Sequence, residues 1–290
     1  MSLSPQRLVD QIEDAPILPP GSDERFDGYG VMGLPFSSGH VLALRRFPAT
    51  SVGPGYTSVW HRDPQGEWVF YGTAAPQLGC SRYFGMNALA STQTEVRITW
   101  LAPARFRVVV PAASLEWEVA VGPTVATRLM NAMAQFLPGA AWRNPVFLAA
   151  MGRMAGPVLG VGRVGLYGTA PNGQRFIANP RVLFRVLASR AIVAGTDLGP
   201  PGPVSPQAQL GDFWIPQHGM FAIGRAYFEL AALRRLDVDM ARVLRRRHRV
   251  RVFAAGLLTA GLLLVPMLNL LAPLIATMAM VHLVQRWRAA

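Results

Sequence analysis

The longest stretch without a formal charge lies near the C-terminus, at residues 253–284. A straight helix over these 32 residues would be about 48 Å long, whereas the hydrocarbon core of a bilayer is about 30 Å thick. The stretch is too long for one perpendicular span, and it contains Pro266, Asn269 and Pro273 near its middle. Three shapes are compatible with it: a tilted or kinked span, two short helices folded back as a hairpin, or a buried helical hairpin of a soluble protein.

The residues on both sides of this stretch are basic and favour the hairpin. Because positive charge prefers the cytoplasmic side of a membrane, two basic ends are most easily placed on the same side. Each half would then be about 24 Å long, so that neither half crosses the bilayer fully and the turn falls near Asn269. The residues that we expect at the membrane surface or at the bend are Arg245, Arg246, Arg247, Arg249, Arg251, Pro266, Asn269, Pro273, Arg286, Trp287 and Arg288.

The net charge of +12 is concentrated at the same end of the chain. Residues 234–290 hold ten arginines and two acidic residues, which gives +8, while residues 1–233 contribute +4. In residues 231–252, leucine and valine recur every three or four positions among arginines, which predicts an amphipathic helix on a membrane with anionic head groups. Arginines next to an apolar run favour lipid over nucleic acid, so no nucleic-acid partner is expected.

The end of the chain resembles a known membrane family. The shared pattern is an arginine-rich helix, an apolar run, the spacing P-x-x-N-x-x-x-P at Pro266, Asn269 and Pro273, and a last helix with basic residues. Over residues 244–288 this pattern is similar to the C-terminal end of the etoposide-induced protein/CysZ family. The resemblance implies a partly penetrating helical hairpin. Bacterial members are associated with sulfate permeation, but this chain lacks the other apolar helices of a permease, so sulfate transport is not implied.

Residues 26–230 contain many segments that are typical of antiparallel strands, because β-branched and aromatic residues alternate with polar ones. Residues 1–25 are rich in proline and acids and predict a flexible lead-in. Proline and threonine or asparagine caps predict a helical insert within residues 123–160. The predicted strands lie within residues 40–47, 56–61, 67–72, 95–101, 105–110, 115–121, 162–168, 181–195 and 212–229.

The expected fold class is therefore α+β. It comprises an antiparallel β-rich domain, lipocalin-like or a curled meander, with the helical insert, the amphipathic helix and the membrane hairpin at 253–290. Two segments, GYTSVWHRDPQGEWVFYG and GRVGLYGTAPNGQRFIAN, share the order strand, Pro-x-Gly turn, strand. This arrangement resembles tandem lipocalin-like proteins, a family that includes carotenoid hydratases. The resemblance concerns the fold, since no catalytic motif of that family is matched.

Few residues of the β-region predict chemistry. His61 and Asp63 are the first candidates for an acid/base pair, although a histidine near a turn also serves as a surface or hydrogen-bonded residue. His40, His218 and Cys80 lack the spacing of metal ligands, so neither a metal nor a cofactor is expected. A single cysteine also excludes an intrachain disulfide.

Aromatic residues are concentrated in the first predicted strands. On a curled sheet, alternate positions face inward, where such rings either line an apolar ligand pocket or form an ordinary core. The residues that we expect at a ligand site are Tyr56, Trp60, Trp68, Phe70, Trp100 and Trp117.

We therefore predict a membrane-anchored protein that binds a hydrophobic small molecule, such as a lipid or an isoprenoid. The bulk of the chain is expected on the cytoplasmic side of the cell membrane. Two alternatives are a membrane-associated enzyme that acts on such a ligand and an accessory subunit with a membrane-protein partner. The absence of a catalytic motif favours binding over catalysis.

Overall fold

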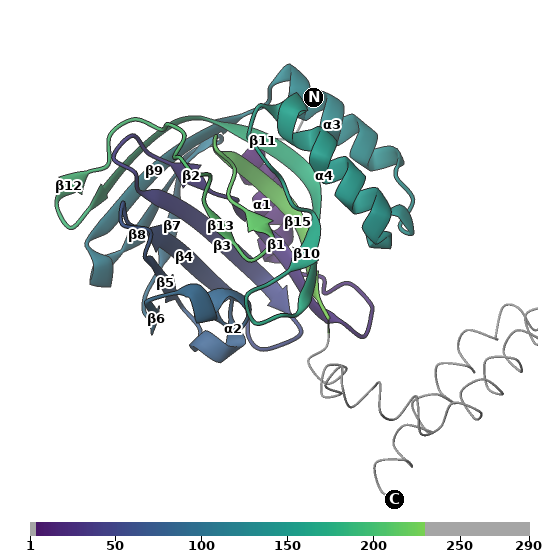
Figure 1. The fold of residues 1–290 in the computed structure, drawn as a ribbon, viewed down its shortest axis with the longest axis horizontal. Coiled ribbons are helices and arrows are strands. Elements are labelled where there is room, and N and C mark those ends of the chain that lie inside the picture. Colours follow the sequence, from purple (N-terminus) through teal and green to yellow (C-terminus); the bar gives the residue numbers. More distant parts are fainter. Residues whose placement is uncertain (1–3, 230–290) are drawn as a thin grey trace, which may run out of the picture. The chain divides into compact units, whose positions relative to one another are not determined.

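The computed structural model describes residues 4–229. The predicted amphipathic helix at 231–252 and the predicted hairpin at 253–290 lie outside these residues. The described residues form an α+β fold in which one large β-sheet curls strongly and a few helices accompany it (Figure 1). No helix within residues 4–229 is both long enough and apolar enough to cross a bilayer. The β-rich class expected from the sequence is confirmed.

The main sheet has the order β6-β5-β4-β3-β1-β15-β11-β9-β8-β7. Neighbouring strands are antiparallel, except that β5 and β6 are parallel. The short strands β2, β10 and β12 pair with β3 or β11, and β13 and β14 form a separate hairpin. The bounds are β1 Glu24–Val31, β2 Leu34–Pro35, β3 Val41–Thr50, β4 Tyr56–Arg62, β5 Trp68–Gly72, β6 Ala90–Gln93, β7 Arg97–Ala102, β8 Arg105–Val110, β9 Leu115–Gly122, β10 Tyr167–Thr169, β11 Arg175–Val193, β12 Thr196–Asp197, β13 Gln209–Leu210, β14 Phe213–Trp214 and β15 Met220–Phe228.

Strand β11 is the longest element of the sheet, with 19 residues. Its first part pairs with β15, and from Arg185 onward it pairs with β9 on its other edge. The register shifts between Pro180 and Val182 and again between Val186 and Ala188. Such irregularities bend a strand and increase its twist, which accounts for the curl of the sheet at β11.

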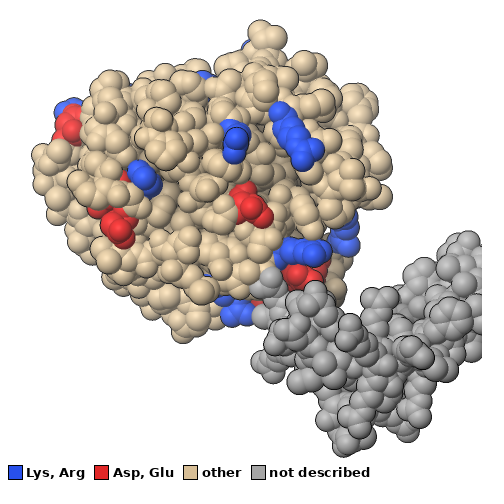
Figure 2. All heavy atoms as spheres, viewed as in Figure 1, with Lys and Arg blue, Asp and Glu red and all other residues tan. Residues whose placement is uncertain are grey.

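The described residues also contain four α-helices and four short 3₁₀ turns. Helix α1 lies in the first part of the segment expected to be a lead-in, and α3 and α4 form the helical insert. The face of the domain drawn in Figure 2 carries few charged groups, and uncharged atoms cover most of it. The bounds are α1 Pro5–Asp14, α2 Ser81–Phe84, α3 Val125–Phe136 and α4 Pro145–Leu159, with 3₁₀ turns at Pro76–Leu78, Gly85–Asn87, Pro111–Ala113 and Ala141–Arg143.

Capping residues in the local sequence mark the start of both insert helices and the end of α4. Thr124 and Thr127 form a reciprocal capping box at the start of α3. The side chain of Asn144 accepts hydrogen bonds from two backbone N–H groups at the start of α4. Helix α4 ends at Gly160, whose φ of 63° is the left-handed conformation that suits a C-terminal cap.

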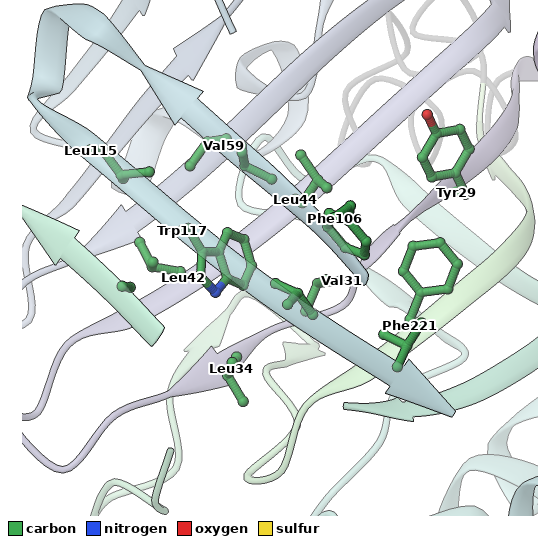
Figure 3. Packing of buried hydrophobic residues seen from close by; sticks show 14 of the residues in the cluster. Tyr29, Val31, Leu34, Leu42, Leu44, Val59, Phe106, Leu115, Trp117 and Phe221 are labelled. Atoms are coloured by element: carbon green, nitrogen blue, oxygen red, sulfur yellow. The ribbon is translucent and has the colours of Figure 1, made fainter. Parts of the chain in front are cut away.

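The two faces of the sheet bury separate apolar clusters. Along β3, Leu42 and Leu44 belong to one cluster, whereas Val41 and Ala43 belong to the other, because successive side chains of a strand point to opposite faces. Helix α1 packs against the first cluster through Val9. Figure 3 shows how side chains from several strands converge in this first cluster, among them Val31, Leu42, Leu44, Phe106, Trp117 and Phe221.

A buried carboxylate ties α2 and the β10–β11 turn to the start of β1. Glu24 is 6% exposed and accepts hydrogen bonds from Tyr83 at 2.7 Å, Arg82 at 2.7 Å and Gln174 at 3.2 Å. Burial alone would raise the pKa of Glu24, but these hydrogen bonds outweigh it and hold the pKa below its usual value. The ionised carboxylate therefore fixes Tyr83 and its helix against the sheet.

Replacing Glu24 with glutamine should lower the free energy of unfolding by about 2 kcal/mol, because charge-assisted hydrogen bonds of a buried group are lost. Denaturant unfolding of the full chain measures this difference. The matched control is Glu95→Gln, which removes only an exposed ion pair with Arg97 and should cost less than about 0.5 kcal/mol. Equal effects of the two variants would contradict the anchoring role of Glu24.

Candidate functional site

A cavity with a volume of about 500 Å³ lies between the sheet and the helices α3 and α4. Its floor comes from β1, β15 and the first part of β11, and its roof comes from the two helices. Aromatic side chains close one end. The side chains that line it are almost all apolar, and none of them is acidic. The volume falls within the range of roughly 300–1,000 Å³ that is common for small-molecule sites.

The floor exists because small residues occupy the middle of two neighbouring strands. Gly28 of β1 lies directly opposite Gly224 of β15. A Cβ atom at Gly28 would lie 2.0 Å from the backbone oxygen of Arg46, and one at Gly224 would lie 2.3 Å from that of Asn179. Only glycine fits at these two positions. Along β15, every second residue lines the cavity, and the sizes run from large to small and back to large at Met220, Ala222, Gly224, Ala226 and Phe228. Arg225 of the same strand also contributes to the lining.

The roof is attached to the sheet by polar contacts. The Asn131 side chain of α3 accepts a hydrogen bond from the backbone N–H of Leu183 at 2.8 Å and donates one to its carbonyl at 3.0 Å. Arg185 donates to the carbonyl of Leu159 at the end of α4 at 2.7 Å. These contacts hold both helices over β11 and leave the apolar side chains of the roof free to line the cavity.

Some roof residues both line the cavity and reach solvent. They show exposed fractions of 56% for Leu129, 48% for Met133, 59% for Met154 and 51% for Val158. The cavity therefore opens to the outside along α3 and α4, and apolar side chains surround its mouth.

Aromatic rings form the end wall. Tyr83 stacks on Phe228 with ring centroids 3.7 Å apart, and Trp60 lies 5.0 Å from Phe84. Such contacts between rings fix the wall in one arrangement. The cavity-lining rings of this wall are Phe26, Tyr56, Trp60, Tyr83, Phe84 and Phe228.

Arg45 supplies a positive charge within this wall. The residue is 5% exposed, and its guanidinium lies 4.8 Å from the ring of Trp60 and 5.4 Å from that of Phe213. Burial lowers the pKa of Arg45 to about 10, which leaves the group charged at neutral pH. No ion pair among residues 4–229 includes Arg45.

A hydroxyl and a thiol lie at the same end of the cavity. The Tyr56 hydroxyl and the Cys80 sulfur are 3.1 Å apart, and both residues are buried. Burial raises the pKa of the Cys80 thiol, although Tyr56 and Arg45 oppose this effect. The thiol is therefore protonated and poorly suited to act as a nucleophile at neutral pH.

The aromatic residues predicted from the sequence are divided between the two faces of the sheet. Tyr56 and Trp60 line the cavity. Trp68 and Phe70 pack against Trp60 in the same apolar cluster without lining the cavity. Trp100 and Trp117 belong to the cluster on the opposite face, where the Trp117 indole donates to Ser189 at 2.8 Å.

The predicted acid/base pair lies elsewhere. A ring nitrogen of His61 is 2.8 Å from one of His40, and the two rings stack. Asp63 accepts a hydrogen bond from the backbone of Glu67 and so stabilises the turn. None of these residues lines the cavity. Within residues 4–229 no group of three or more histidine, cysteine or acidic side chains is arranged to hold a metal ion.

Sequence reasoning missed the residues that shape and charge the cavity. Gly28 and Gly224 are 196 positions apart in the sequence, and nothing local shows that they pair. Arg45 carried a usable signal, because the neighbouring Arg46 must point to the opposite face of the same strand. One of the two arginines must therefore face the interior of the domain.

Comparison with known proteins gives little further information. No protein-family description matches the chain, and no curated protein is similar to it in sequence. One solved structure with some similarity is an acetoacetate decarboxylase from Legionella pneumophila, with a TM-score of 0.34 and 10% sequence identity over 72% of this chain and 86% of the decarboxylase. A likeness of this degree transfers neither a fold family nor an activity.

The histidine pair makes stability depend on pH. Burial and the neighbouring His40 lower the pKa of His61 from 6.5 to about 4, although Asp63 opposes this shift. Between these two pKa values the unfolded chain takes up a proton that the folded chain does not, so the free energy of unfolding falls as the pH falls. From pH 7.5 to pH 5, His61 should account for a loss of roughly 2 kcal/mol.

Urea unfolding at the two pH values, for the wild type and for His61→Gln, measures this contribution. The variant should lose less stability on acidification than the wild type. An identical loss would mean that other groups cause the acid sensitivity.

Proposed function

We propose that the domain described by residues 4–229 binds a hydrophobic small molecule in the cavity between the sheet and the helices α3 and α4. The observation that carries this proposal is the size and apolar lining of the cavity. Protein interiors are close-packed, with few voids larger than a water molecule. Glycine and alanine occupy several successive cavity-facing positions of the floor, so no large side chain fills the space above them. A small residue at one position could be a packing defect, whereas a run of small residues supports a binding site.

We further propose that the ligand passes between this cavity and a membrane. Helix α3 turns polar residues toward the sheet, since Thr127 is buried and Asn131 bonds to β11. Among its apolar side chains, Val125 and Phe136 are exposed, and Leu129 and Met133 line the cavity and also reach solvent at its mouth. The exposed apolar side chains of α3 and α4 include Val125, Leu129, Met133, Phe136, Val146 and Met154. An exposed apolar surface of this kind is typical of a site that meets a protein partner or a membrane.

The charges on the helix pair favour a membrane with anionic head groups. Arg128, Arg143 and Arg153 are exposed, and residues 123–160 contain no acidic residue. Arginines around an apolar surface suit the interface of an anionic bilayer. The predicted segments 231–252 and 253–290, which lie outside the described residues, would hold the chain at the same membrane. In this proposal, the mouth of the cavity that α3 and α4 border meets the lipid surface.

Filling the cavity should prevent ligand binding. The phenyl ring in Ala222→Phe would occupy the floor, and the free energy of unfolding should change by no more than about 1 kcal/mol because the added atoms enter existing space. The full chain is purified in a mild detergent, and mass spectrometry quantifies the small molecules extracted per protein. We expect Ala222→Phe to lose most of the hydrophobic compounds found with the wild type.

The matched control is Ala102→Phe, which places the same side chain on an exposed position of β7. This variant should retain the compounds in the wild-type amount. If both variants carry the same amount as the wild type, the compounds do not occupy the cavity.

Contact between α3 and lipid can be measured by fluorescence. Cys80 is the only cysteine and is buried, so a cysteine introduced by Phe136→Cys should be labelled selectively. In vesicles that contain brominated lipids, the label at position 136 should be strongly quenched, and anionic lipid should increase the quenching. A label introduced by Leu101→Cys on β7 serves as the control and should be quenched little. Similar quenching at both positions would contradict membrane contact by the helices.

A further inference from the structure

Arg45 is held rigidly at the closed end of the cavity. One terminal nitrogen of its guanidinium donates to the carbonyl oxygens of Val31 at 2.5 Å and Leu44 at 2.8 Å, and the other donates to that of Met32 at 3.0 Å. These neutral acceptors and the rings of Trp60 and Phe213 fix the side chain without neutralising its charge. The cation is thus positioned before any ligand arrives.

Several other arginines in or next to the sheet have acidic partners, whereas Arg185 of β11 bonds to a backbone carbonyl. Arg46 pairs with Glu13 at 2.7 Å, Arg82 with Glu24 at 2.7 Å and Arg225 with Asp27 at 3.2 Å. Arg45 is more deeply buried than these three and has no such partner within residues 4–229. Burying a charge is costly unless it is paired, and no acidic side chain lines the cavity.

We propose that the ligand is an amphipathic carboxylate, whose acidic head pairs with Arg45 and whose apolar chain extends over the Gly28–Gly224 floor toward the helices. This inference rests on the proposed function and names the chemical class of its ligand. The Tyr56 hydroxyl lies at the same end of the cavity and offers a second hydrogen-bonding group. A carboxylate has only two oxygens to satisfy, whereas a phosphate ester has more charge and more acceptors than this apolar wall can match.

Two photoactivatable probes test the proposal. They share one long alkyl chain with a diazirine and differ only in the head group, which is a carboxylate in one and a primary alcohol in the other. The full chain is placed in phosphatidylcholine nanodiscs, and each probe is added at the same membrane concentration. Mass spectrometry then measures labelling of the α4 peptide that contains Phe147 and Met151, which line the cavity.

In the wild type, the carboxylate probe should label this peptide about tenfold more than the alcohol probe, as expected for a charge-assisted hydrogen bond. Arg45→Gln should reduce labelling by the carboxylate probe to the level seen with the alcohol probe. Labelling by the alcohol probe should stay unchanged. Arg45→Lys should restore part of the preference because it keeps a cation. The matched control Arg97→Gln removes an exposed arginine of β7 and should preserve the full preference.

Equal labelling by the two probes in the wild type would overturn the proposed head group and leave hydrophobic binding intact. If neither probe labels the cavity, the proposal of hydrophobic binding is overturned as well. If Arg45→Gln fails to fold, the comparison of head groups in the wild type still decides the question. A preference that persists in a folded Arg45→Gln protein would also overturn the role of Arg45.

Discussion

The pairing of Gly28 with Gly224 is the constraint on which the rest of the site depends. At these two positions the carbonyl groups of neighbouring strands lie where a Cβ atom would be. The sheet is therefore thin in its middle, and larger residues at the ends of β15 form the rims of a shallow bowl. The shape of the cavity floor is thus a consequence of backbone packing in the sheet, and α3 and α4 supply the roof that encloses the space above it.

The roof follows from the same geometry. Because the floor offers α3 little surface for side-chain packing, the helix is attached through Asn131, whose amide bonds both backbone groups of Leu183. This attachment leaves Val125 and Phe136 exposed, in the reverse of the usual amphipathic orientation. Helix α3 therefore borders the apolar cavity on one side and exposes apolar residues on the other, and the proposed membrane contact rests on this arrangement.

The sequence predicted the strands better than the site. Alternation of apolar and polar residues identifies most strands, and proline and threonine or asparagine caps identify α3 and α4, because these signals are local. The apolar stripe of α3 was equally visible, but its spacing does not tell whether it faces a core or the outside. Likewise, Trp60 and Trp117 looked like members of one pocket. They lie on opposite faces because Val59, the neighbour of Trp60 on β4, is the residue that joins Trp117 in the first cluster. Which positions of β4 and β9 share a face is set by pairings between distant strands.

The adjacent residues Arg45 and Arg46 show how the two faces of one strand are used differently. Both guanidiniums are removed from water to a large extent, and both sit on the same backbone. On one face Arg46 meets Glu13 of α1, so that face is closed by the protein's own carboxylate. On the other face Arg45 meets only carbonyl dipoles and aromatic rings, which stabilise a cation but do not neutralise it. Because the cost of an unpaired buried charge favours an anion at that place, the same physical rule that explains the Arg46–Glu13 pair argues for an acidic ligand at Arg45.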